Sequence, residues 1–209
     1  MKRKINRIIE RKRKLLLIFF FFISASMQSQ CIDNENDKLQ LVEAKVIFNK
    51  PPNHFCNRPP DSYFEIHPDF HQSPFYITII NNDNQIMTCI STMAYPKPIN
   101  KISRYLIANV DLNHISEKAL ALQIDTRLGK MSMVGPNNIK KLNAHRGYLY
   151  NIKVKDKYLG IYPRCKKLEI YKDNIGRAEI LFFYKYGQDE IVMKEIGKTW
   201  GMLKFKSLH

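Results

Sequence analysis

The stretch AEILFFYKY, residues 178–186, is the most apolar run of the chain beyond its N-terminal segment. Alternate residues of a strand point to opposite faces of a sheet. In this run aromatic side chains would therefore lie on both faces: Phe182, Phe183, Tyr184 and Tyr186. We expect a central strand that is covered on both sides. The alternative is a strand whose exposed aromatic face receives a partner.

Short strands separated by turn residues surround this run. Residues 168–172 precede it across the turn at 173–176, and residues 190–196 follow it after Gly187. A last strand is expected at 200–205, and residues 148–154 alternate between apolar and polar. Because short loops join antiparallel neighbours, the pattern predicts a meander, the second β unit, over 139–209.

The first half of the chain shows the same alternation. Val42, Ala44, Val46 and Phe48 alternate with polar residues, which predicts a half-buried strand over 41–48. Residues 75–80 and 85–90 flank a run of Asn and Asp and predict a hairpin. Shorter strands are expected at 63–66, 105–110 and 158–162, whereas 116–124 fits either a strand over 120–124 or a short helix capped by Ser116. We place this first β unit at 39–128.

About a dozen short strands with no sustained helical period predict an all-β fold, an antiparallel sandwich or partly closed barrel. Glycines, a proline and asparagines at 129–138 mark the expected boundary between two small β units. One continuous domain is the alternative.

The N-terminal segment has the three parts of an export signal. Eight basic residues precede a short apolar run at 15–23, and the small residues Ser24 and Ser26 follow it. The run is shorter than the roughly 20 residues of a membrane-spanning helix. We therefore expect a signal peptide over 1–30, with an uncleaved N-terminal anchor or a lipoprotein acylated on Cys31 as alternatives, and a tether over 31–38. The predicted location is periplasmic or secreted, with the membrane contacted only through the N-terminal segment.

The charge of the chain is concentrated in that segment. The whole chain has 34 basic and 19 acidic residues, a net charge of +15. The first 26 residues hold eight of the basic and one of the acidic residues, so the remainder has 26 against 18, or +8. The remaining cations are spread along the chain rather than clustered among aromatics, which argues against nucleic acid as a partner.

The four cysteines are expected to form disulfides in an oxidising compartment. Sequence alone allows three connectivities. We predict a bond between Cys56, which lies in a proline-rich loop, and Cys89, at the end of the predicted hairpin. Cys165 is expected to be a free, buried thiol.

The candidates for a metal site are His54, His67, Asp69 and His71, with Cys56 nearby. Their spacing matches no standard zinc motif, and Pro68 prevents the helix that would bring His67 and His71 together. We therefore expect a polar loop, with no metal, no cofactor and no catalytic residue.

The order of several short motifs resembles the small periplasmic immunity lipoproteins associated with type VI secretion systems. The resemblance covers residues 31–110 and rests on Cys31, DKL at 37–39, EAKVIF at 43–48, NHFC at 53–56, the strand at 63–66, Cys89-Ile90 and the strand at 105–110. It implies a β-rich protein that binds a co-encoded toxin and blocks it without catalysis.

Three functions are therefore considered. The first is an exported, non-catalytic protein-binding module, such as an immunity protein whose partner is a secreted toxin. The second is an envelope hydrolase or metal-binding protein that uses the His-rich loop. The third is a structural or adhesive surface protein.

Overall fold

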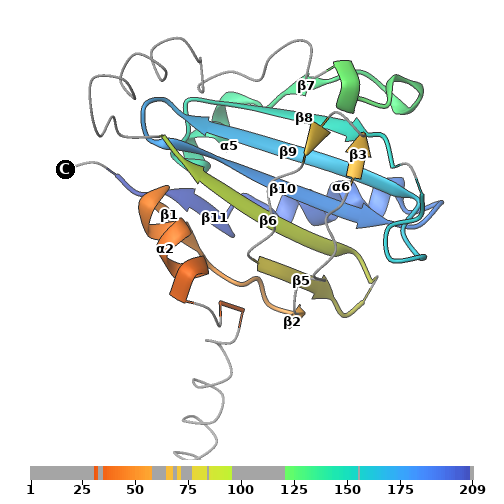
Figure 1. The fold of residues 1–209 in the computed structure, drawn as a ribbon, viewed down its shortest axis with the longest axis horizontal. Helices are drawn as coiled ribbons and strands as arrows, with labels where there is room; N and C mark the ends of the chain where they lie inside the picture. Colours follow the sequence, from red (N-terminus) through yellow and green to blue (C-terminus); the bar gives the residue numbers. More distant parts are fainter. Residues whose placement is uncertain are drawn as a thin grey trace, which may run out of the picture.

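A computed structural model of the chain describes residues 31–32, 35–57, 65–67, 70–71, 77–83, 85–95, 121–154 and 156–207 (Figure 1). The predicted signal at 1–30, Asp69 and the predicted strand at 105–110 lie outside the described residues.

The described elements follow one another along the chain with short connections. They are α2 (Glu35–Glu43), β1 (Val46–Phe48), β2 (His54–Asn57), β3 (Glu65–His67), β4 (Phe70–His71), β5 (Ile77–Asn81), β6 (Met87–Ala94), η2 (Thr126–Leu128), β7 (Ser132–Met133), α5 (Pro136–Leu142), β8 (Arg146–Ile152), β9 (Arg164–Lys172), β10 (Gly176–Tyr184), α6 (Asp189–Thr199) and β11 (Leu203–Phe205).

A seven-stranded antiparallel sheet, in the order β2-β5-β6-β10-β9-β8-β7, forms the centre of the molecule (Figure 1). β5 and β6 form the hairpin predicted at 75–90, and β8, β9 and β10 form the predicted meander. β10 is the central strand, with β6 on one side and β9 on the other. Strands from both expected β units therefore lie in one sheet.

Both faces of β10 are buried, which explains its aromatic content. Ile180, Phe182 and Tyr184 face a core completed by α2, α5, α6 and the two-stranded sheet of β1 and β11. Leu181 and Phe183 face a second core completed by the segment around Tyr158 and Tyr162. The prediction of a central strand covered on both sides is confirmed, because residues 178–184 are all buried.

The sequence analysis was wrong about residues 190–196, which belong to helix α6 and not to a strand. Val192, Glu195, Ile196 and Thr199 are buried, with a spacing of three or four residues. This is the period of a helix that packs one stripe against a sheet. In Figure 1, α6 lies behind the sheet, on the face of the first core.

The predicted strand at 41–48 is wrong in its first half, and the tether at 31–38 is partly wrong. Residues 35–43 form helix α2, and only Val46–Phe48 is extended. Leu41 and Ala44 are buried three residues apart, whereas Val42, expected on the buried face, is 58% exposed. Lys45 has a φ of 52° where the chain changes from helix to strand.

Three further segments differ from their predictions. Helix α5 begins with Pro136 at its first turn, a position where proline is favourable, inside the expected boundary. Residues 121–123 are helical and only Ile124 makes a bridge, to Ile152. The predicted strand at 158–162 is a tight turn closed by a bridge between Tyr158 and Tyr162.

The predicted fold class is nevertheless confirmed. Strand accounts for 42% and helix for 24%, and the antiparallel sheets do not close into a barrel. Among the described residues, none of the helices has the length and apolar character needed to cross a bilayer.

Candidate functional site

An open groove lies at the end of the sheet where β9 begins and β10 ends. It has a volume of about 690 Å³, and its walls are η2 and the first two turns of α6. The lining residues are Leu128, Lys166, Asp189, Glu190, Met193 and Lys194. This groove therefore combines two apolar side chains with four charged ones.

Hydrogen bonds fix the floor of the groove to its η2 wall. Lys166 Nζ donates to Asn151 Oδ1 at 2.7 Å, and Asn151 Nδ2 donates to the Leu128 carbonyl at 2.6 Å. Asn151 thus holds Lys166 and Leu128 in place from the neighbouring strand β8. Burial lowers the pKa of Lys166, as does the positive charge of Arg164, although Asp189 acts against both.

Asp189, the first residue of α6, is held by two donors. Arg164 Nη1 donates to its Oδ2 at 2.6 Å, and the Tyr184 hydroxyl donates to its Oδ1 at 3.1 Å. The negative charge of Asp189 is also favourable at a helix N-terminus. Both carboxylate oxygens are therefore already used within the protein.

Exposed apolar and aromatic side chains surround the groove. Tyr186 is 67% exposed, and the guanidinium carbon of Arg164 lies 5.2 Å from the centre of its ring. Met193 and Ile191 on α6 are also exposed. Tyr, Arg and Met are the residue types enriched where proteins bind one another.

A second charged cluster lies on the opposite face of the sheet and is buried. Lys167 Nζ lies 3.2 Å from Glu179 Oε2 and 4.0 Å from Glu169 Oε1, and the Tyr150 hydroxyl donates to Glu169 at 2.8 Å. Burial raises the pKa of Glu169, and the charge of Glu179 adds to that rise, against the effects of Lys167 and Arg177. Because these two carboxylates have two cations beside them and almost no exposure, the cluster is self-compensated and closed to ligands.

His54, a predicted metal candidate, belongs to a buried ion pair. Its Nδ1 donates to the Pro52 carbonyl at 2.8 Å and its Nε2 to Glu195 Oε1 at 2.5 Å. Both partners are acceptors, so both ring nitrogens carry protons and the imidazole is charged. Burial alone would lower the pKa of His54, but the bonds to Glu195 and Pro52 raise it overall.

The remaining contacts of Glu195 complete this pair. Asn81 Nδ2 and Lys198 Nζ donate to its Oε2 at 2.9 Å and 3.0 Å. Burial would raise the pKa of Glu195, but these donors and His54 lower it overall. The network joins strands β2 and β5 to helix α6, and it leaves neither ring nitrogen of His54 free to bind a metal.

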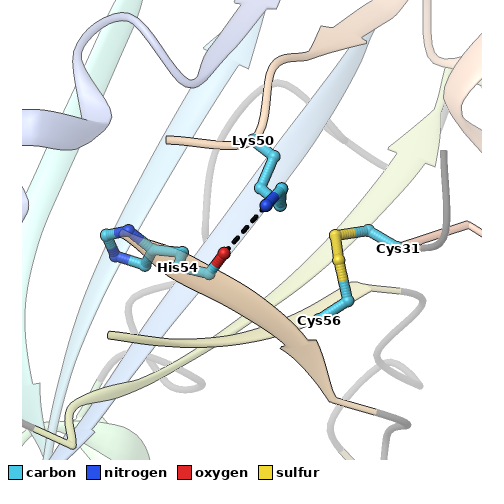
Figure 2. The surroundings of a disulfide bond; sticks show 4 residues. All are labelled: Cys31, Lys50, His54 and Cys56. Carbon is cyan, nitrogen blue, oxygen red and sulfur yellow. Dashed lines mark hydrogen bonds between the residues drawn. A yellow bond between two sulfur atoms is a disulfide. The ribbon is translucent and has the colours of Figure 1, made fainter. Parts of the chain in front are cut away.

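The predicted disulfide is wrong: Cys56 is bonded to Cys31, 25 residues away, and Cys89 is a free, buried thiol. Figure 2 shows the bond beside His54 on the same short strand, with Lys50 Nζ donating to the His54 carbonyl at 2.8 Å. Cys89 lies on β6 directly opposite Thr78 of β5, one strand away from Cys56 on β2. Since the disulfide uses the Cys31 sulfur, acylation of that sulfur and the bond exclude each other.

Cys165 is a free and buried thiol, as predicted. Burial raises the pKa of Cys89 to about 12 and that of Cys165 well above its usual range. Both therefore remain protonated near neutral pH, which is unsuitable for a nucleophile.

The remaining metal candidates are His67, Asp69 and His71. His67 lies on β3 and His71 on β4, a separate two-stranded sheet, and Asp69 is outside the described residues. Within the described part of the chain, no group of three or more His, Cys, Asp or Glu side chains is placed to hold a metal ion.

Sequence reasoning missed the groove. Lys166 was interpreted as a solvated position, and Asp189 as part of a turn. The available signal was the helical spacing of Val192 and Ile196, which would have placed Met193 and Lys194 on the exposed side of a helix.

The chain matches no protein-family model, and no similar protein is found among curated proteins.

Proposed function

We propose that this protein is an exported, non-catalytic module that binds another protein, and that its partner is a toxin encoded beside it. The proposal rests on one observation. The groove end of the molecule exposes an aromatic side chain, Tyr186, stacked on Arg164 and next to the apolar Met193.

This arrangement suits binding better than chemistry. Exposed Tyr and Arg side chains supply much of the binding energy in protein complexes. Arg164 is held by Asp189, so little conformational freedom would be lost when a partner covers it. A nucleophile or general base in the groove would need an uncommitted group, whereas Asp189 has both oxygens bonded and Lys166 is tied to Asn151.

Export is part of the proposal. The Cys31–Cys56 bond is compatible with an oxidising compartment, and the basic and apolar residues at 1–26 are the parts of a secretory signal.

The test is coexpression with the product of the neighbouring reading frame, directed to the periplasm. We expect growth inhibition by that product to be relieved by the wild-type chain, and we expect the two purified proteins to form a complex. Absence of a complex and of protection would refute the proposed function. Tyr186→Ala is the matching variant, because its side chain is mostly exposed and its loss should weaken binding without unfolding the protein.

A further inference from the structure

We propose that the groove between η2 and α6 binds a segment of the partner in which an acidic side chain lies beside an apolar one. The acidic side chain would pair with Lys166 and Lys194, and the apolar one would pack on Leu128 and Met193. This inference rests on the proposed function and names the chemistry of the partner at that same surface.

The first argument is the unused hydrogen-bonding capacity of Lys166. An ammonium group has three N–H donors, and within the described part of the chain the Lys166 group donates to one acceptor, Asn151 Oδ1. Its exposure is intermediate, and burial lowers its pKa. A carboxylate brought into the groove would offset that desolvation and accept the remaining protons.

The second argument is the balance of charge. Three cations lie in or beside the groove, Arg164, Lys166 and Lys194, against the two acids Asp189 and Glu190. Arg164 already neutralises Asp189. Among the described residues, Lys194 has no acceptor within hydrogen-bond distance. The excess is positive, and the net charge of +15 on the chain favours approach by an acidic partner.

The third argument distinguishes a protein segment from a nucleic acid. A phosphodiester chain would place successive negative charges along the α6 wall, against Glu190 and Asp189. One carboxylate can lie between the two lysines without meeting both acids. Leu128 and Met193 give a polypeptide apolar contacts that a phosphate backbone could not use.

The groove is also preorganised. Asn151 fixes Lys166 and the Leu128 backbone, and Arg164 and Tyr184 fix the start of α6. Binding would therefore require little rearrangement of the receptor.

The first experiment measures affinity for the product of the neighbouring reading frame. Lys194→Glu and Lys166→Met should each weaken binding by about tenfold or more. Lys141→Glu is the matched control, because Lys141 is an exposed lysine on α5 near the opposite end of the sheet. It should change affinity by less than about twofold, since surface charges distant from an interface contribute little. Thermal unfolding of each variant verifies that it is folded.

Binding by the wild-type chain together with unchanged binding by both groove variants would overturn the groove assignment and leave the proposed function intact. A wild-type chain that does not bind the neighbouring product would refute the proposed function, and a second probe then decides the groove by itself. That probe is a short peptide of alternating Glu and Tyr, compared with the same peptide carrying Gln in place of Glu.

We expect the Glu peptide to shift the backbone amide resonances of Lys166, Met193 and Lys194, with an effect that weakens as salt is added. The Gln peptide should shift them much less. Equal shifts from both peptides, or shifts spread over the basic surface as a whole, would overturn the inference.

Discussion

The disulfide between Cys31 and Cys56 should contribute a large share of the stability of the fold. The bond closes a loop between residues 25 positions apart. In the chain-entropy model a loop of this length stabilises the native state by about 3.5 kcal/mol at 25 °C. For a chain of this size that corresponds to a fall in Tm of about 7 to 14 °C when the bond is removed.

The perturbation is Cys31→Ser combined with Cys56→Ser, and the assay is urea unfolding with and without dithiothreitol. We expect the double variant, unreduced, to match the reduced wild-type protein. Each single variant should lose the same stability, since either removes the same bond, and none should respond to the reductant.

Cys89→Ala is the matched comparison. It removes a buried thiol and will be destabilising, but it should keep the full response to dithiothreitol. A response that disappears in Cys89→Ala and persists in Cys31→Ser would refute the pairing. A loss below about 1 kcal/mol on reduction would refute the assigned contribution of the loop.

Other consequences of the structure can be measured on the same protein. Removing His54 as His54→Ala leaves Glu195 buried with only Asn81 and Lys198, and should cost about 3 to 5 kcal/mol in urea unfolding; a cost below about 1 kcal/mol would contradict the buried pair. Because folding raises the pKa of His54 and lowers that of Glu195, the stabilisation from this pair should be fullest between about pH 4.5 and 6.5, falling above that range as His54 loses its proton and below it as Glu195 gains one; the loss should be absent from the pH profile of Glu195→Gln. The thiols of Cys89 and Cys165 should resist Ellman's reagent at pH 8 in the folded protein and react in urea, because burial keeps them protonated and inaccessible; rapid labelling of the native protein would show that this core is open. A Cβ on residue 176 would lie 2.5 Å from the Met93 carbonyl oxygen, so Gly176→Ala should cost about 1 to 3 kcal/mol by forcing β6 and β10 apart, whereas Gly135→Ala, with no atom within 4 Å, is the control.

The central strands could be predicted from sequence because their pattern is local. The turn at 173–176 and the aromatic run after it specify β9 and β10 without reference to the rest of the chain, and both are found where expected. The hairpin of β5 and β6 is similar, with Asn81 Oδ1 accepting from the Asp83 amide in the predicted turn.

The errors arose where one apolar run fits two periods. In residues 190–196 the apolar positions are 191, 192, 193 and 196, which suit a buried strand as well as a helix. The helix forms because a stripe containing Val192 and Ile196 covers one face of the sheet, which is a tertiary requirement. The same reason explains α2, where Leu41 and Ala44 pack against that core.

The disulfide and the groove could not be predicted because both depend on contacts distant in sequence. Cys31 approaches Cys56 because residues 31–32 pack beside the first core and β2 forms the edge of the sheet. The groove combines η2, β9 and α6, three elements whose residues span 128 to 194.

The pairing of β1 with β11 affects the order in which the chain can fold. Val46 lies opposite Phe205, so one of the earliest described strands is completed by the last. Contacts between such distant segments slow folding, because a long loop must close before they form. A chain released from the ribosome from its N-terminus lacks β11 until synthesis ends, and helix α2 and β1 cannot dock fully before then. For a protein exported as we propose, this delay keeps the chain in the unfolded form that a translocation channel accepts.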